Sequence, residues 1–134
     1  PTPFEIETAL AYYYFEQNDC DFAVVECGMG GKEDATNVAD NKVLSVLTSV
    51  ALDHTQFLGD TLEKITEQKI GIVKGSPLVS ASQYPEVLAV LKDKISDLTL
   101  ADVSKIVNTK LSFEETIFDY KEYKNIKIKM LGKS

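Results

Sequence analysis

The sequence predicts an α/β fold, with a mostly parallel three-layer sheet between helices on both faces and an antiparallel hairpin toward the C-terminal end. Two observations predict it. Short apolar runs of β-prone residues alternate with segments of helical periodicity, in the order α-β-β-α-β-α-β. After Ser112 the apolar residues recur at every second position, which is typical of a β-hairpin with one face exposed to solvent. Ligands of open α/β sheets bind at the carboxyl ends of the strands.

Length and composition suit one compact domain. The chain has 134 residues, 44% of them hydrophobic, and a net charge of -7. This charge argues against binding to nucleic acid, which needs clustered Lys and Arg to neutralise phosphates. The longest apolar-rich run, residues 43–52, is about half the roughly 20 residues that cross a bilayer. We therefore expect a cytoplasmic protein with no nucleic-acid and no membrane partner.

The first predicted elements are a helix and a strand. The helix covers residues 3–17, where Thr2 can be the N-cap and Glu5 can complete a capping box. Its aromatic cluster favours packing as core against the sheet. A buried strand over residues 22–27 then delivers Glu26 to a glycine-rich turn.

Residues 28–41 are too rich in glycine and polar residues to be regular, and a second buried strand is predicted over residues 43–51. A loop of about 15 residues without secondary structure is usually functional in a compact domain. We therefore expect this loop to form part of the site.

The next helix is predicted from Asp60, as its cap, to about Val73, with Glu63 at the third helical position. Lys69 falls in the middle of the apolar face of this helix.

The remaining elements are a short strand, an amphipathic helix, another strand and the hairpin. They are predicted over residues 77–81, 85–98 and 103–107, and after Ser112 up to Met130. The hairpin is expected at the edge of the parallel sheet.

The two ends of the chain indicate that the sequence is a piece of a longer protein. The sequence starts at Pro1 without an initiator Met and stops at Ser134 without a helix end or a closing turn. We expect residues 1–134 to form a single partial domain.

Three residues carry the chemical argument. Glu26 either accepts hydrogen bonds from the following turn or provides an oxygen ligand for a divalent cation. His54, the only histidine, is either a capping or core imidazole or a metal ligand. An ammonium on a core face is costly unless it is paired or neutralised. Lys69 therefore either pairs with Glu26 or Asp53, or is carbamylated.

Carbamylation adds CO₂ to the neutral amine and, with loss of a proton, gives a carboxylate-like anion. Together with a carboxylate and an imidazole, this anion would make a Mg²⁺ or Mn²⁺ site open to phosphate oxygens. Metal hydrolases with a bridging carbamylated lysine usually supply several histidines, whereas this chain has one. We discount that rival class.

Several motifs follow one another over residues 1–80. They are Pro1-Thr-Pro-Phe-Glu5, Glu26-Cys-Gly-Met-Gly-Gly31, Asp34-Ala-Thr-Asn37, Asp53-His54, Leu58-Gly59 and Glu67-Gln-Lys-Ile-Gly-Ile-Val-Lys74. In these motifs the chain resembles the folylpolyglutamate synthase / dihydrofolate synthase family of the Mur ligase superfamily, in the family's order and at about its spacing. The closing Leu131-Gly-Lys resembles the start of a further short motif of the same domain.

The resemblance implies an ATP-dependent amide ligase that adds L-glutamate to a folate or to dihydropteroate. In the family, ATP phosphorylates the acceptor carboxylate, and the amino group of L-glutamate attacks the acyl phosphate with release of ADP and phosphate. Carried over by position, Glu26 is a Mg²⁺ ligand, His54 ligates a second metal ion and Lys69 is the carbamylated lysine. We expect Lys69 and His54 to take part in catalysis.

The same resemblance implies a pterin site and a missing phosphate site. Phe4 matches an aromatic residue that packs on the pterin, and Asp34 and Ala35 match a loop that hydrogen-bonds it. No Gly-x-x-Gly-Lys-Ser/Thr phosphate loop is present. In the family that loop lies N-terminal to these residues and the glutamate-binding domain lies C-terminal. We therefore expect the chain alone to be inactive.

Two alternatives stay open. One is another Mur-type ligase that adds an amino acid to a cell-wall precursor. The other is a non-catalytic α/β domain in which Lys69 only pairs with Glu26. We expect the longer parent protein to be monomeric. We expect the isolated chain to self-associate through exposed strand edges and apolar faces.

Overall fold

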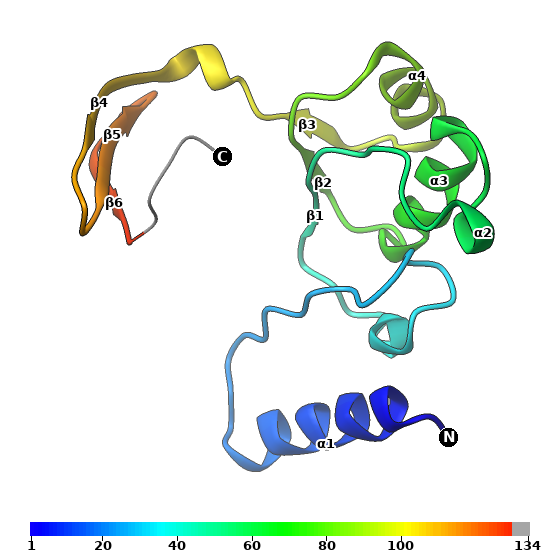
Figure 1. The fold of residues 1–134 in the computed structure, drawn as a ribbon. Coiled ribbons are helices and arrows are strands. Elements are labelled where there is room, and N and C mark those ends of the chain that lie inside the picture. The colour runs from blue at the N-terminus through cyan, green and yellow to red at the C-terminus, as the bar shows by residue number, and fades with distance from the viewer. Residues whose placement is uncertain (130–134) are drawn as a thin grey trace. The chain divides into compact units, whose positions relative to one another are not determined.

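The computed structural model describes residues 1–129, so the expectations for Met130 and for the Leu131-Gly-Lys motif lie outside the described residues. The chain divides into two compact units, Pro1–Thr99 and the part from Leu100 onward. Each unit has its own three-stranded sheet (Figure 1), and the last strand of the first sheet ends at Leu100, the first residue of the second unit.

The sheet of the first unit is formed by β1 (Ser45–Leu47), β2 (Leu78–Ser80) and β3 (Leu98–Leu100), in the order β1-β2-β3. β1 and β2 run parallel, with Ser45 opposite Leu78. The predicted strands 43–51 and 77–81 are therefore confirmed, although both are shorter. Parallel neighbours joined by helices confirm the α/β class.

Helices α2 (Thr55–Leu58), α3 (Leu62–Lys69) and α4 (Pro85–Lys94) pack with this sheet. Figure 1 shows α3 and α4 side by side, and the two helices are in contact. The buried core joins all three helices to β1 and β2. Its members are Leu47, Val50, Leu58, Ile65, Val73, Leu78, Val87 and Leu91.

The helix predicted from Asp60 begins one residue later, at the N-cap Thr61. Thr61 has an extended backbone and its hydroxyl accepts a hydrogen bond from the Lys64 amide at 3.3 Å. Asp60 is exposed and instead pairs with the Lys64 ammonium at 2.8 Å. After Lys69 the helix tightens into the 3₁₀ turn Ile70–Ile72, so helical structure extends almost to the predicted end.

Helix α1 (Pro3–Gln17) begins with the predicted capping box. The Thr2 amide donates to Glu5 Oε2 at 2.6 Å, and the Glu5 amide donates to Thr2 Oγ1 at 3.2 Å. The prediction that its aromatic face is core is wrong. Leu10 is 60% exposed and Tyr14 is 63% exposed, because no part of the described chain covers that face.

The predicted strand over residues 22–27 is also wrong. The segment has no strand hydrogen bonds, and Val24 is 99% exposed. A strand is defined by its ladder, and none of the strands in residues 1–129 pairs with this segment. Its apolar sequence is that of a buried strand, but a partner strand is needed to make it one.

The second unit is an antiparallel sheet of β4 (Ile106–Leu111), β5 (Thr116–Tyr120) and β6 (Tyr123–Ile128), with β5 in the middle. The predicted hairpin is confirmed as β5 and β6. It pairs with β4, whereas the expectation placed it at the edge of the parallel sheet.

The predicted strand over residues 103–107 is wrong in its first half. Residues Val103–Lys105 form a 3₁₀ turn that is capped by Asp102, whose Oδ1 accepts from the Ser104 amide at 3.0 Å. This local hydrogen bond competes with strand formation. The fourth predicted strand is thus replaced by β3, which precedes the turn, and by β4, which follows it.

None of the helices within residues 1–129 combines the length and the apolar character that a membrane crossing requires.

Candidate functional site

The glycine-rich loop predicted as part of the site lies against the carboxyl end of α3. The Lys32 amide donates to the Gln68 carbonyl at 2.9 Å. A Cβ atom on Gly31 would stand 2.6 Å from the Lys69 carbonyl oxygen, and one on Gly71 would stand 2.5 Å from Cβ of Lys32. Glycine is needed at both positions because the two backbones meet there without room for a side chain.

Lys69 is the last residue of α3 and is half-buried. Ile65, one turn earlier, is completely buried. Within residues 1–129 the Lys69 ammonium makes neither an ion pair nor a hydrogen bond, so the salt bridge to Glu26 or Asp53 that sequence reasoning left open is not formed. The side chain is therefore available for a ligand or for modification.

Glu26 and His54 are both exposed in this chain. Glu26 stands in the extended segment that leads into Gly28, on the same loop as Gly31. His54 precedes α2 in a left-handed conformation, with φ of 48°, and its side chain is 50% exposed. Its amide donates to Asp53 Oδ1 at 2.8 Å, and its Nε2 lies 3.6 Å from Asp53 Oδ2.

The metal-ligand set of Glu26, His54 and Lys69 stays a prediction. Within the described residues, no three His, Cys, Asp or Glu side chains gather in a group that could hold a metal ion. The predicted set counts Glu26 and His54 as two donors of these types and requires an anionic form of Lys69 as the third. A carbamate on Lys69 would have the oxygen chemistry that Mg²⁺ and Mn²⁺ prefer.

Two of the residues expected to hold a pterin lie together around Gly28. A Cβ atom at Gly28 would stand 2.7 Å from Cζ of Phe4 and 3.3 Å from Oδ2 of Asp34. The Phe4 ring therefore lies next to the glycine turn and stays 42% exposed. Ala35, the third residue, follows Asp34 as the first residue of the 3₁₀ turn η1 (Ala35–Val38) and is half-buried.

Asp34 caps this turn with Oδ1 and binds the glycine loop with Oδ2. Oδ1 accepts from the Thr36 amide at 2.9 Å and from the Thr36 hydroxyl at 2.5 Å, and Oδ2 accepts from the Met29 amide at 2.8 Å. Burial acts to raise the pKa of Asp34, but hydrogen bonds from Thr36, Met29 and Gly28 outweigh it and leave the pKa below its ordinary value.

Helix α1 reaches the same turn through a residue that the sequence does not mark. The Tyr12 hydroxyl donates to the Thr36 carbonyl at 2.9 Å. Tyr12 belongs to a run of three tyrosines whose members look alike in the sequence, so only the structure separates it from Tyr13 and Tyr14.

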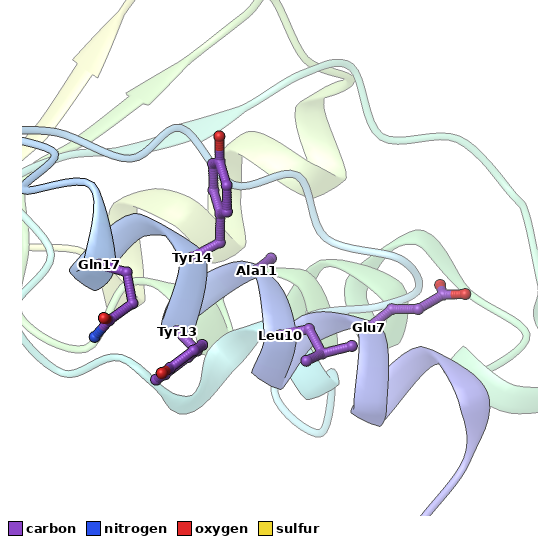
Figure 2. Close-up of a pocket in the computed structure, with 6 residues that line it drawn as sticks. All are labelled: Glu7, Leu10, Ala11, Tyr13, Tyr14 and Gln17. Carbon is purple, nitrogen blue, oxygen red and sulfur yellow. The ribbon is translucent and has the colours of Figure 1, made fainter.

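A shallow apolar hollow on α1 does not belong to this site. Figure 2 shows its lining, which comes from α1 alone and includes none of the predicted site residues. The lining residues are Glu7, Leu10, Ala11, Tyr13, Tyr14 and Gln17.

The fold and the glycine loop place the chain in a known class. Residues 1–134 match the Mur ligase middle domain, and the chain belongs to that family.

Within this family the chain is similar to folylpolyglutamate synthases. It is 48% identical over 96 residues to the folylpolyglutamate synthase of Lacticaseibacillus casei, which is 71% of this chain and 22% of that protein. It is 47% identical over 94 residues to the dihydrofolate synthase/folylpolyglutamate synthase of Bacillus subtilis, which is 69% of this chain and 22% of that protein. The chain thus spans about a fifth of the length of these curated relatives.

Solved structures extend the likeness over nearly the whole chain. The structure titled "FPGS-AMPPCP-folate complex" is 37% identical with a TM-score of 0.87, over 98% of this chain and 34% of that one. The structure titled "E.coli FolC in complex with DHPP and ADP" is 30% identical with a TM-score of 0.69, over 94% of this chain and 31% of that one.

The low pKa of Asp34 gives a pH-dependent contribution to stability. A carboxylate whose pKa is depressed on folding stabilises above its unfolded pKa of about 3.9, and this contribution is lost as pH falls through the folded pKa. We expect Asp34→Asn to be less stable than the wild type by about 1 kcal/mol at pH 7. The difference should shrink below about pH 4, which urea unfolding across pH would measure. The exposed Asp21→Asn is the control, and a difference that grows toward low pH would contradict this account.

Proposed function

We propose that the full-length protein that carries this sequence is an ATP-dependent ligase that joins L-glutamate to folates, and that it acts on dihydropteroate as well. The observation that carries the proposal is the packing of the glycine loop on the end of α3, where Gly31 meets the Lys69 carbonyl. The chain that has this packing is 48% identical to a folylpolyglutamate synthase over 96 residues. The titles of the similar structures name AMPPCP, folate, DHPP and ADP as bound molecules.

The reaction takes two steps, the formation of an acyl phosphate and the formation of an amide bond. A carboxylate oxygen of the folate attacks the γ-phosphorus of ATP, which forms an acyl phosphate and releases ADP. The amino group of L-glutamate then attacks the acyl carbon, the tetrahedral intermediate expels phosphate, and the amine proton is lost to a base. Both steps depend on positioning and on neutralising the charge of the phosphates.

Mg²⁺ or Mn²⁺ would supply that neutralisation, held by Glu26, His54 and carbamylated Lys69. The half-buried position of Lys69, without a competing salt bridge, supports this assignment. Lys69 and His54 are the residues for which we propose a role in catalysis.

The pterin would be recognised at the turn around Gly28. The exposed face of the Phe4 ring offers a stacking surface, and Asp34 offers carboxylate oxygens that can accept hydrogen bonds from pterin N–H groups. Ala35 stands beside Asp34, where its backbone can contact the same ligand.

We further propose that both units of the chain belong to one partial ligase domain. The family match spans residues from both units, which supports this view. The phosphate loop and the glutamate-binding domain would come from other parts of the parent protein. We propose a cytoplasmic location and a monomeric parent.

Lys69→Ala tests the proposed ligase in the full-length protein. We expect L-glutamate-dependent release of ADP, with dihydropteroate or a reduced folate as acceptor, to fall at least 100-fold in this variant. Added bicarbonate should raise the activity of the wild type and leave the variant unchanged.

Lys64→Ala is the matched control on the same helix, because the Lys64 ammonium is exposed and pairs with the exposed Asp60. Its activity should stay within about twofold of the wild type. Wild-type turnover with a cell-wall precursor and none with pterin substrates would move the assignment to another Mur-type ligase.

Phe4→Ala tests the pterin site. Loss of the ring should raise the KM for the pterin substrate about tenfold and leave the KM for ATP within a factor of about two, because stacking is worth on the order of 1 kcal/mol or more. Steady-state kinetics would measure both constants, with the exposed Phe113→Ala as control. An equal rise in both KM values would exclude a specific pterin contact.

The isolated chain should self-associate. The apolar hollow on α1 and the extended segment with Phe22 and Val24 leave large apolar side chains in water. We expect light scattering of residues 1–134 to give a mass that rises with concentration above 14.8 kDa. A constant monomer mass would show that these surfaces do not associate.

A further inference from the structure

Asn37 is buried where the glycine loop meets the end of α3. Its side-chain amide donates to the Lys32 carbonyl at 3.1 Å and to the Gly71 carbonyl at 3.2 Å. Only 8% of Asn37 is exposed. One side chain therefore joins the loop that follows Gly31 to the turn that follows Lys69.

Two lysines hold Asn37 in place, and one of them, Lys42, also binds a carbonyl of the 3₁₀ turn that follows α3. Lys42 Nζ donates to Asn37 Oδ1 and, at 2.9 Å, to the Ile72 carbonyl. Lys74 Nζ donates to the Asn37 carbonyl at 2.5 Å and to Asp40 Oδ1 at 2.7 Å. Carbonyls at the end of a helix carry partial negative charge, and cations beside them are stabilising.

The hydrogen bonds of Asn37 act very close to the proposed site. Gly71 is two residues beyond Lys69, and Lys32 directly follows Gly31, whose Cα faces the Lys69 carbonyl. Loss of the Asn37 amide would free both partners at once. The backbone hydrogen bond from the Lys32 amide to the Gln68 carbonyl would remain, together with the contacts of the Lys42 and Lys74 ammonium groups.

We infer that Asn37, oriented by Lys42, is a positioning residue that sets the place of Lys69 relative to the glycine loop. The inference rests on the proposed ligase function, because it assigns Asn37 a role in the rate of that reaction. It concerns placement only, since Asn37 is occupied by protein groups and acts through Lys69.

Asn37→Asp in the full-length protein separates this role from simple packing. The substitution keeps the shape of the side chain and an oxygen for Lys42, but it replaces the amide donor by an acceptor that faces two carbonyls. We expect kcat for glutamate-dependent ADP release to fall at least tenfold, with the KM for ATP and for L-glutamate within about twofold.

Hydrogen exchange provides a readout that does not depend on activity. In Asn37→Asp, the amides of residues 30–34 and 70–73 should exchange faster, whereas those of α4 should keep their wild-type rates. Lys42→Met should lower kcat at least fivefold, and Lys42→Arg, which keeps a cation and donors, should restore most of it.

Asn41→Asp is the matched control, because Asn41 lies on the same loop and is exposed. Its kcat should stay within about twofold of the wild type. An active wild type with an unchanged kcat in Asn37→Asp overturns the positioning role, and so does faster exchange that includes α4, since it would report a general loss of stability. A wild type without glutamate-dependent turnover overturns the proposed function itself, and the positioning role with it.

Discussion

The approach of two backbones at Gly31 and Gly71 is the constraint on which the first unit depends. A side chain at Gly31 would collide with the carbonyls of Lys69 and Gln68, and one at Gly71 would collide with the backbone of Lys32. Backbone atoms cannot move aside as the end of a flexible side chain can. The loop therefore docks on α3 only with glycine at both positions, and the docking brings the segment after Glu26 to the helix that ends at Lys69.

The N-terminal helix joins the same assembly by polar contacts rather than by an apolar core. Tyr12 donates to the Thr36 carbonyl, and Asp34 gathers three donors from Thr36 and Met29. These bonds bring the start of α1 to the glycine turn, where Phe4 lies next to Gly28. The face of α1 that carries Leu10 and Tyr14 stays in water in this chain.

The second unit depends on a single buried acid in its central strand. Asp119 accepts from the Asn108 side-chain amide at 2.8 Å and from the Asn125 backbone amide at 2.8 Å. Both asparagines have positive φ, at 55° and 54°, next to irregular registers of the sheet. The hydrogen bond from the Asn108 side chain is the main cause that lowers the pKa of Asp119 below its ordinary value. The hydrogen bond from the Asn125 backbone amide is the next largest cause.

The sequence alone determined the features that depend on neighbours a few positions apart. These are the capping box at Thr2, the presence of the helix that carries Lys69 and the period-two pattern of the hairpin. Only the tertiary structure decided that residues 22–27 lack a ladder, that Tyr12 alone of three tyrosines binds the turn, and that Asn37 binds the turn that follows α3. Strand pairing, burial and long-range hydrogen bonds need a second surface, and a local pattern does not specify which segment provides it.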